Sequence, residues 1–259
     1  MLLAIDVGNT NIKLGVYDED ELKYSWRLSV HTIRTSDELA AQILILFSTV
    51  GIKFDNITGI ILSSVAPSIN YTVIHMCTHY INMKPLIVGP GTKTGMDIKY
   101  SNPQELGADR IVNSVAAYKL YGGPCIVIDY GTATTFNVVS EKGEMLGGVI
   151  AAGIKTSLES LTDRTDKLSL VELHSPKKAI CRTTETNLQA GAILGVTGQT
   201  EYIIRKIKEE LGRQDVKVIA TGGLSSLINE ENDKLLDITD RYLTLKGLKI
   251  IYDLNTKKH

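Results

Sequence analysis

The sequence predicts an α/β protein built from two similar domains, and three observations support this prediction. Short apolar segments typical of buried strands alternate with longer segments of helical periodicity. Two strand-like segments end in similar acidic turns, Asp6-Val7-Gly8-Asn9 and Asp129-Tyr130-Gly131-Thr132, which start 123 residues apart in a chain of 259. Between them, Gly122-Gly123-Pro124 interrupts a helical segment. We therefore expect one domain at residues 1–119 and a second at residues 120–259.

In the first half, three strands precede an alternation of helices and strands. Helices are expected to begin near Ser36 and Ser68, and a third to run over Pro103–Tyr121. Asn102 supports that third start, because Asn is a good N-cap and proline is favoured at the first helical position. This order resembles the ribonuclease H-like unit, a three-layer α/β domain. The predicted strands are Leu2–Val7, Lys13–Tyr17, Lys23–Leu28, Gly59–Ser64 and Leu86–Val88.

The second half begins with the same pattern. A lone Asp-x-Gly turn is common, but two copies at strand ends, half a chain apart, indicate a duplicated domain. We expect both acidic turns to face a central cleft between the two copies. The predicted strands are Cys125–Tyr130, Phe136–Val139, Met145–Ala151 and Val216–Ala220, and the predicted helices are Glu185–Leu211 and Tyr242–Tyr252.

The composition is typical of a soluble enzyme. The formal net charge is −1 and no basic run stands out, so nothing indicates nucleic-acid binding. The cysteines Cys77, Cys125 and Cys181 are odd in number and form no Cys-x-x-Cys pair, which favours a reducing compartment. No apolar stretch approaches the ~20 residues of a membrane span, and the N-terminus lacks the basic region of a signal peptide. We expect a cytoplasmic protein that contacts no membrane.

The turn after Asp6 predicts a phosphate site. Backbone N–H groups of a glycine-rich turn can face phosphate oxygens, and the small or polar residues Gly8, Asn9 and Thr10 allow a close approach. Lys13 lies across the hairpin, where its charge can meet a β- or γ-phosphate. Asp6 offers a hard oxygen ligand for Mg²⁺, usually through water. The competing interpretation is a plain hairpin turn in which Asp6 bonds its own loop.

The second acidic turn predicts a second phosphate clamp. Thr132 follows Gly131, so hydroxyl and backbone amide groups are available together. Asp129 can hold a cation from the opposite wall of the predicted cleft. Taken alone, this segment too could be a simple turn.

The segment Gly107-Ala108-Asp109-Arg110 conflicts with the helix predicted around it. Glycine in a helix interior costs about 1 kcal/mol relative to alanine, and Asp is also a poor interior residue. Local rules that are broken together indicate a functional site. Asp109 can accept a proton from a substrate hydroxyl, and Arg110 can pair with an anionic substrate group. The competing interpretation is an Asp–Arg pair on the surface beside a packing glycine.

Two other segments look functional but are weaker candidates. Gly89–Gly95 follows a strand, yet it matches neither phosphate-loop pattern, so a loop on the substrate side that leads to Tyr100 is favoured. His75, Cys77 and His79 resemble a metal-binding set. In a helix, however, only the two histidines share a face, so an ordinary helix surface is the expected outcome.

Six motifs together are similar to those of the type III pantothenate kinase family, within the acetate-and-sugar-kinase and actin-like superfamily. The resemblance covers essentially the whole length. One departure is Ala152, which stands where the family usually has proline and loses the fixed φ of that residue. The motifs are Asp6–Lys13, Ser64–Pro67, Gly89–Gly95, Gly107–Arg110, Asp129–Thr135 and Gly147–Gly153.

The resemblance implies ATP-dependent phosphorylation of pantothenate to 4'-phosphopantothenate, the first step of coenzyme A biosynthesis. It implies that Asp109 is the general base and that Asp129 holds a monovalent cation, K⁺ or NH₄⁺. It also implies a homodimer whose interface helps to close the substrate pocket. The implied ATP-binding residues are Asp6, which also holds Mg²⁺, with Gly8, Asn9, Thr10, Lys13 and Thr132. The implied pantothenate-binding residues are Tyr100, Gly107, Ala108, Asp109, Arg110 and Thr184.

Two other functions are compatible with the phosphate turns. A non-catalytic ATP-binding regulator of the same fold would keep both turns but would have no use for Asp109, Arg110 and Tyr100. A kinase for a different small hydroxy acid would keep all of them, and only the family resemblance at Tyr100 and Thr184 argues against it.

Overall fold

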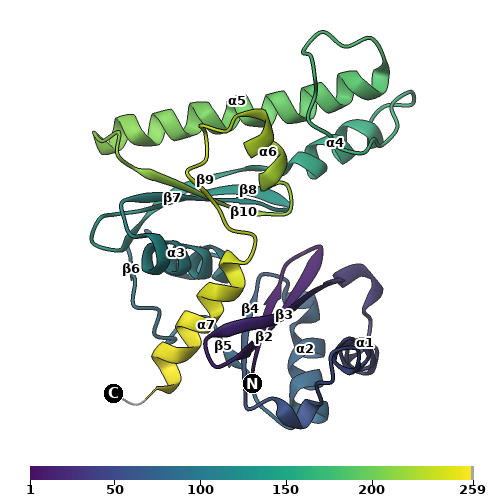
Figure 1. The fold of residues 1–259 in the computed structure, drawn as a ribbon, viewed down its shortest axis with the longest axis vertical. Helices are drawn as coiled ribbons and strands as arrows, with labels where there is room; N and C mark the ends of the chain where they lie inside the picture. Colours follow the sequence, from purple (N-terminus) through teal and green to yellow (C-terminus); the bar gives the residue numbers. More distant parts are fainter. Residues whose placement is uncertain (258–259) are drawn as a thin grey trace. The chain divides into compact units, whose positions relative to one another are not determined.

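The computed structural model describes residues 1–257 and contains two compact units, each built around one mixed sheet (Figure 1). The first unit comprises Met1–Met96, Ser101–Ala116 and the segment from Leu243 onward. The second comprises Asp97–Tyr100 and Ala117–Tyr242. Residues 258–259, the end of the predicted second domain, lie outside the described part. No helix among residues 1–257 combines the length and apolar composition needed to cross a membrane.

The first sheet has the strand order β3-β2-β1-β4-β5. Neighbours among β1, β2 and β3 are antiparallel, whereas β4 and β5 run parallel to β1. On one face, alternate residues such as Leu3, Ile5 and Leu62 form a core with the helices α1 and α2. The strands are β1 (Leu2–Val7), β2 (Asn11–Asp18), β3 (Glu21–Ser29), β4 (Gly59–Ser64) and β5 (Leu86–Ile87), and the helices are α1 (Ser36–Ser48) and α2 (Pro67–Tyr80).

The other face of the first sheet is covered by the last helix, α7 (Leu243–Thr256), which contacts β1, β2 and β4. Small residues allow this close contact. A Cβ added to Gly15 would lie 3.0 Å from Leu245, and one added to Gly59 would lie 2.0 Å from the Tyr252 hydroxyl. The chain therefore returns to its first unit at its end, whereas the sequence placed this helix in a domain at 120–259.

The second sheet has the order β11-β10-β7-β8-β9-β6. β7, β8 and β9 are antiparallel neighbours, and β10 and β11 run parallel to β7. The helices are α4 (Ile154–Asp163), α5 (Thr184–Leu211) and α6 (Ser225–Glu231). The strands are β6 (Asp97–Ile98), β7 (Cys125–Tyr130), β8 (Ala133–Val139), β9 (Glu144–Ala152), β10 (Lys217–Gly222) and β11 (Ile238–Thr239).

The duplication predicted from the two acidic turns is confirmed. In each sheet a three-stranded antiparallel meander is followed by two strands parallel to the first, which is the ribonuclease H-like order. The sequence missed β6, β11, α4 and α6. These are short elements, and their packing rather than their local pattern determines them.

The continuous helix predicted over Pro103–Tyr121 is wrong. A single 3-10 turn, Pro103–Glu105, follows the Asn102 cap, whose side chain accepts from the Gln104 N–H at 3.3 Å. Leu106 is then extended, and the helix α3 begins only at Ala108 and ends at Tyr121. The start signal was therefore identified correctly, but it belongs to a separate turn. Asp109 consequently lies in the first turn of its helix rather than in the interior.

Candidate active site

The first acidic turn holds an ion pair between neighbouring strands. Asp6, next to last in β1, is 4% exposed and pairs in register with Lys13 of β2. The Lys13 Nζ lies 3.3 Å from the Asp6 Oδ2. The turn between them is tight, because the Gly8 N–H donates to the Asn11 carbonyl at 2.9 Å. Asn9 and Thr10 at the tip are exposed. Asp6 therefore forms an ion pair with Lys13 across the hairpin, and is not limited to bonds with its own loop.

Two hydroxyl residues that no sequence motif marked also lie at this position. Ser63 of β4 pairs in register with Asp6 on the side opposite Lys13. Thr244 of α7 is 2% exposed, and its Oγ1 accepts from the Lys13 Nζ at 3.5 Å. A lone Ser in a strand and a lone Thr in a helix carry no local signal. Only the strand register and the return of the C-terminal helix bring them to Asp6.

The start of α3 is held near the same end of the first sheet. The Val65 N–H, just after β4, donates to the Val7 carbonyl at the end of β1 at 3.0 Å. A Cβ added to Gly107 would lie 3.3 Å from the Val65 side chain and 2.6 Å from the Asp109 Oδ1. Gly107 therefore leaves the space that the Asp109 carboxylate and Val65 occupy. This explains the glycine that looked misplaced in the sequence.

Asp109 is in a position that stabilises a carboxylate. Its Oδ1 accepts the Arg110 N–H at 2.7 Å, and it lies in the first helical turn, where the backbone dipole favours negative charge. The residue is partly exposed to solvent. Arg110 is only 6% exposed, which excludes a solvated Asp–Arg surface pair.

The second acidic turn belongs to the second unit and is fixed by glycines. Asp129 is next to last in β7 and pairs in register with Thr135 and Thr221. A Cβ added to Gly153 would lie 2.4 Å from the carbonyl oxygens of Gly131 and Thr132, so no larger residue fits there. The exposed Thr132 also accepts from the Thr156 hydroxyl at 2.7 Å through its carbonyl. The segment that contains Gly153 and Thr156 thus packs closely against this turn.

The predicted pantothenate residues are divided between the units. Gly107, Ala108, Asp109 and Arg110 belong to the first. Tyr100 follows β6 and is half-buried, and the exposed Thr184 begins α5, so both belong to the second. These assignments to pantothenate remain predictions.

The residues near Asp6 fit a magnesium ion held mainly by its substrate. Within residues 1–257, no three His, Cys, Asp or Glu side chains are grouped so that they could hold a metal ion. Magnesium commonly uses one or two carboxylates together with substrate phosphates, and Asp6 supplies one. At α2, His75 stacks on His79 at 5.3 Å between ring centroids, while Cys77 is fully buried in the core, so the cysteine does not share a face with the two histidines.

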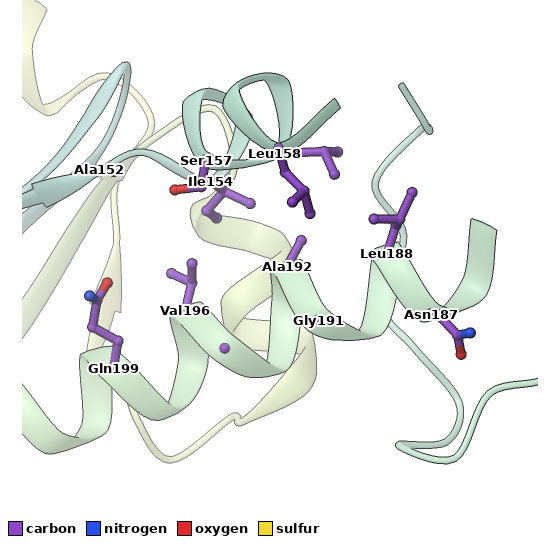
Figure 2. A pocket seen from close by; sticks show the side chains of 12 residues that line it. Ala152, Ile154, Ser157, Leu158, Asn187, Leu188, Gly191, Ala192, Val196 and Gln199 are labelled. Atoms are coloured by element: carbon purple, nitrogen blue, oxygen red, sulfur yellow. The ribbon is translucent and has the colours of Figure 1, made fainter. Parts of the chain in front are cut away.

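The second unit contains a pocket of about 390 Å³ (Figure 2). It is formed between α4 and α5, where Leu158 and Ile154 face Ala192 and Val196. The lining is mostly apolar, and it contains none of the predicted ATP or pantothenate residues.

The two acidic turns occupy corresponding strand ends of two sheets with one topology. This arrangement defines the class of protein as one with the duplicated ribonuclease H-like fold. A Baf family protein from Campylobacter jejuni is 21% identical, covers 98% of each chain and gives a TM-score of 0.61. The inorganic polyphosphate/ATP-glucomannokinase from Arthrobacter sp. strain KM is 13% identical, with 100% of this chain and 99% of that chain covered and a TM-score of 0.50. Such low identities show the fold alone.

Sequence similarity identifies the family. The family model of type III pantothenate kinase matches residues 2–206. The type III pantothenate kinase of Geobacillus kaustophilus (strain HTA426) is 49% identical over 258 residues, which is 100% of this chain and 99% of the relative. The chain belongs to the type III pantothenate kinase family, whose reaction is the first step of coenzyme A biosynthesis. The alternative of a non-catalytic ATP-binding regulator has no support.

Proposed function

We propose that this kinase transfers the γ-phosphoryl group of ATP to the primary hydroxyl of pantothenate at the end of β1 in the first unit. One observation carries the proposal. The Asp6–Lys13 pair and Asp109 are both tied to this end of the first sheet, the former by strand register and the latter through Val65 and Gly107. Phosphoryl transfer depends mainly on positioning and charge neutralisation, and this arrangement supplies both a cation and a carboxylate.

The first turn would bind the phosphates. Lys13 supplies a positive charge, and the backbone amides around Gly8, Asn9 and Thr10 supply donors. Asp6 is the carboxylate that would hold Mg²⁺, most simply through water. Mg²⁺ held there would neutralise charge that develops on the transferring group.

Asp109 would be the general base. Its carboxylate is held by the Arg110 N–H and remains partly exposed, so it can orient the attacking hydroxyl and accept its proton. The buried Arg110 would pair with an anionic group of the substrate. Tyr100, Ala108 and Thr184 would complete the pantothenate site.

The second turn would bind a monovalent cation and part of ATP. Asp129 lies in register between Thr135 and Thr221, so a carboxylate is flanked by two hydroxyl residues. Oxygen ligands of this kind suit K⁺, and they can also accept hydrogen bonds from NH₄⁺. Thr132 would contact ATP beside this cation.

The protein would act as a homodimer. Apolar side chains on β9 and α4 of the second unit support this proposal, because they are exposed in a single chain: Leu146, Val149, Ile150 and Leu161 are 36–62% exposed. Light scattering of the purified protein should give twice the mass of one chain, and Ile150→Glu should shift the measured mass towards that of the monomer. A monomeric wild-type protein would contradict the proposed homodimer.

A cytoplasmic location is supported by the free thiols of Cys77, Cys125 and Cys181.

The activity is tested by coupling ADP release to a spectroscopic readout. Pantothenate is compared with a panel of other hydroxy acids and sugars at saturating ATP and Mg²⁺. We expect ADP release with pantothenate and little with the other compounds. Efficient turnover of another hydroxy acid, with none of pantothenate, would contradict the assignment of Tyr100, Arg110 and Thr184 to a pantothenate site.

A further inference from the structure

A buried hydroxyl beside Asp6 has no partner within residues 1–257. Ser63 of β4 is 0% exposed, and its Oγ makes no hydrogen bond. The next residue shows that the chain can satisfy such a group. The Ser64 hydroxyl bonds the Asn70 side chain and accepts the Ala66 N–H at 3.2 Å. Buried polar groups without a partner are uncommon and costly, so Ser63 needs an explanation.

The position of Ser63 points to the active site. Strand register places Ser63, Asp6 and Lys13 in one row across β4, β1 and β2. Residues in one row project to the same face of a sheet. The alternate residues Ile5 and Leu62 belong to the core on the other face. The hydroxyl therefore lies on the same face as the carboxylate and the ammonium group.

The second sheet repeats this arrangement within itself. Thr221 of β10 lies in register beside Asp129, and it is 1% exposed. The two residues before it, Ile219 and Ala220, are apolar, as are Ile61 and Leu62 before Ser63. In each duplicated half, the strand that runs parallel to the first strand therefore places a hydroxyl residue directly opposite the acidic residue: Ser63 opposite Asp6, and Thr221 opposite Asp129. A packing requirement alone would be met by alanine or valine.

We propose that Ser63 is a further binding residue of the phosphoryl-transfer site, and that its hydroxyl donates a hydrogen bond to an oxygen of the magnesium–nucleotide complex held by Asp6 and Lys13. The proposal rests on the assignment of that pair to ATP. A neutral donor suits this position, because a second carboxylate beside Asp6 would repel phosphate oxygens. The ligand oxygen also removes the cost of the unsatisfied hydroxyl.

The experiment measures binding without turnover. ATP is titrated calorimetrically into the full-length protein with Mg²⁺ and without pantothenate, and thermal unfolding is recorded with and without nucleotide. For Ser63→Ala we expect a Kd for ATP raised about 10- to 100-fold, as for a lost hydrogen bond to a charged group. The unfolding midpoint without nucleotide should stay equal or rise, because the lost hydroxyl had no partner in the protein. Ser63→Thr, which copies Thr221, should bind within about threefold of wild type.

Ser114→Ala is the matched control, because Ser114 is also a 0% exposed serine whose hydroxyl has no partner within residues 1–257. It should leave ATP affinity unchanged. The inference is overturned if Ser63→Ala binds ATP like wild type, if Ser114→Ala loses as much affinity, or if Ser63→Ala does not fold without nucleotide. Lys13→Ala is titrated in parallel. If it keeps wild-type affinity, the proposed ATP site itself is wrong; if it loses affinity while Ser63→Ala does not, only the role of Ser63 fails.

Discussion

The Lys13 Nζ lies 3.3 Å from the Asp6 Oδ2 and donates to the Thr244 Oγ1 at 3.5 Å, so the last helix of the chain reaches the first acidic turn. The side chains of Lys13 and Asp6 are 25% and 6% exposed, which makes this a largely desolvated pair. A hydrogen-bonding partner on a packed helix restricts where the lysine can point. Thr244 is therefore a positioning residue for Lys13.

We expect Thr244→Val to raise the KM for ATP roughly 2- to 10-fold, the usual effect of one lost neutral hydrogen bond. The KM for pantothenate should change little, and Thr244→Ser should restore the KM for ATP. Thr256→Val, an exposed threonine on the same helix, is the control. Equal effects on both KM values, or no rescue by serine, would indicate a merely structural role. Steady-state kinetics with each substrate varied in turn provides the measurement.

Asp109→Asn should reduce turnover by about 10²–10⁴, the range for loss of a general base. The amide can still accept the Arg110 N–H, so the helix start should persist. ATP affinity, measured by calorimetry, should remain near wild type. Near-normal turnover of the variant would exclude Asp109 as the base.

Turnover should be higher in potassium or ammonium than in sodium salts at equal ionic strength. Replacing Asp129 by Asn should reduce this difference, because the carboxylate that would bind the ion is lost. Equal wild-type rates in sodium and potassium would count against a selective monovalent cation site. The ADP-release assay in the respective chloride salts measures this directly.

Gly247→Ala should destabilise the protein by about 1–3 kcal/mol, the range for overpacking. The added Cβ would lie 2.3 Å from the Val112 carbonyl oxygen, so α7 and α3 must shift. Gly198→Ala in α5 is the matched control, since its Cβ would meet no described atom within 4 Å. That change should stabilise the helix by about 0.5–1 kcal/mol. Urea unfolding measures the free energy of unfolding of both variants. If Gly247→Ala has the same free energy of unfolding as wild type, the close contact between α7 and α3 is disproved.

The alkaline stability of the protein should depend on Tyr121, whose hydroxyl donates to the Asp240 Oδ2 at 2.7 Å. Burial, together with this hydrogen bond, raises the pKa of Tyr121 to about 12. Tyrosine in an unfolded chain has a pKa of about 10. The folded state therefore holds the proton more tightly, and this contribution is present below pH about 10 and lost as the pH rises towards about 12.

Tyr121→Phe should accordingly make the free energy of unfolding fall less steeply between pH about 10 and about 12. Tyr71→Phe, at a ring that is 77% exposed, serves as the control and should follow wild type. Urea titrations at several pH values give both curves. If the free energy of unfolding falls equally steeply with pH for wild type and Tyr121→Phe over this range, the pKa of Tyr121 is not raised by folding as described.

Local patterns were sufficient for much of the fold. The apolar runs before Asp6 and Asp129 predicted β1 and β7, because a buried strand reads as a short apolar segment ending in a turn. Their repetition predicted the duplicated topology. The same reasoning failed at Pro103–Tyr121, where a good N-cap opened a single 3-10 turn and not the helix itself. A start signal does not say how far an element continues.

The sequence by itself determined the two acidic turns and the duplicated order of strands, since both follow from residues adjacent in the chain. Only the tertiary structure decided that α7 belongs with the first unit and that Ser63 and Thr244 stand beside the Asp6–Lys13 pair. The physical reason is distance along the chain. Thr244 lies 231 residues from Lys13, and contacts of that kind depend on strand register and on small residues such as Gly15 and Gly247, which leave no periodic signal.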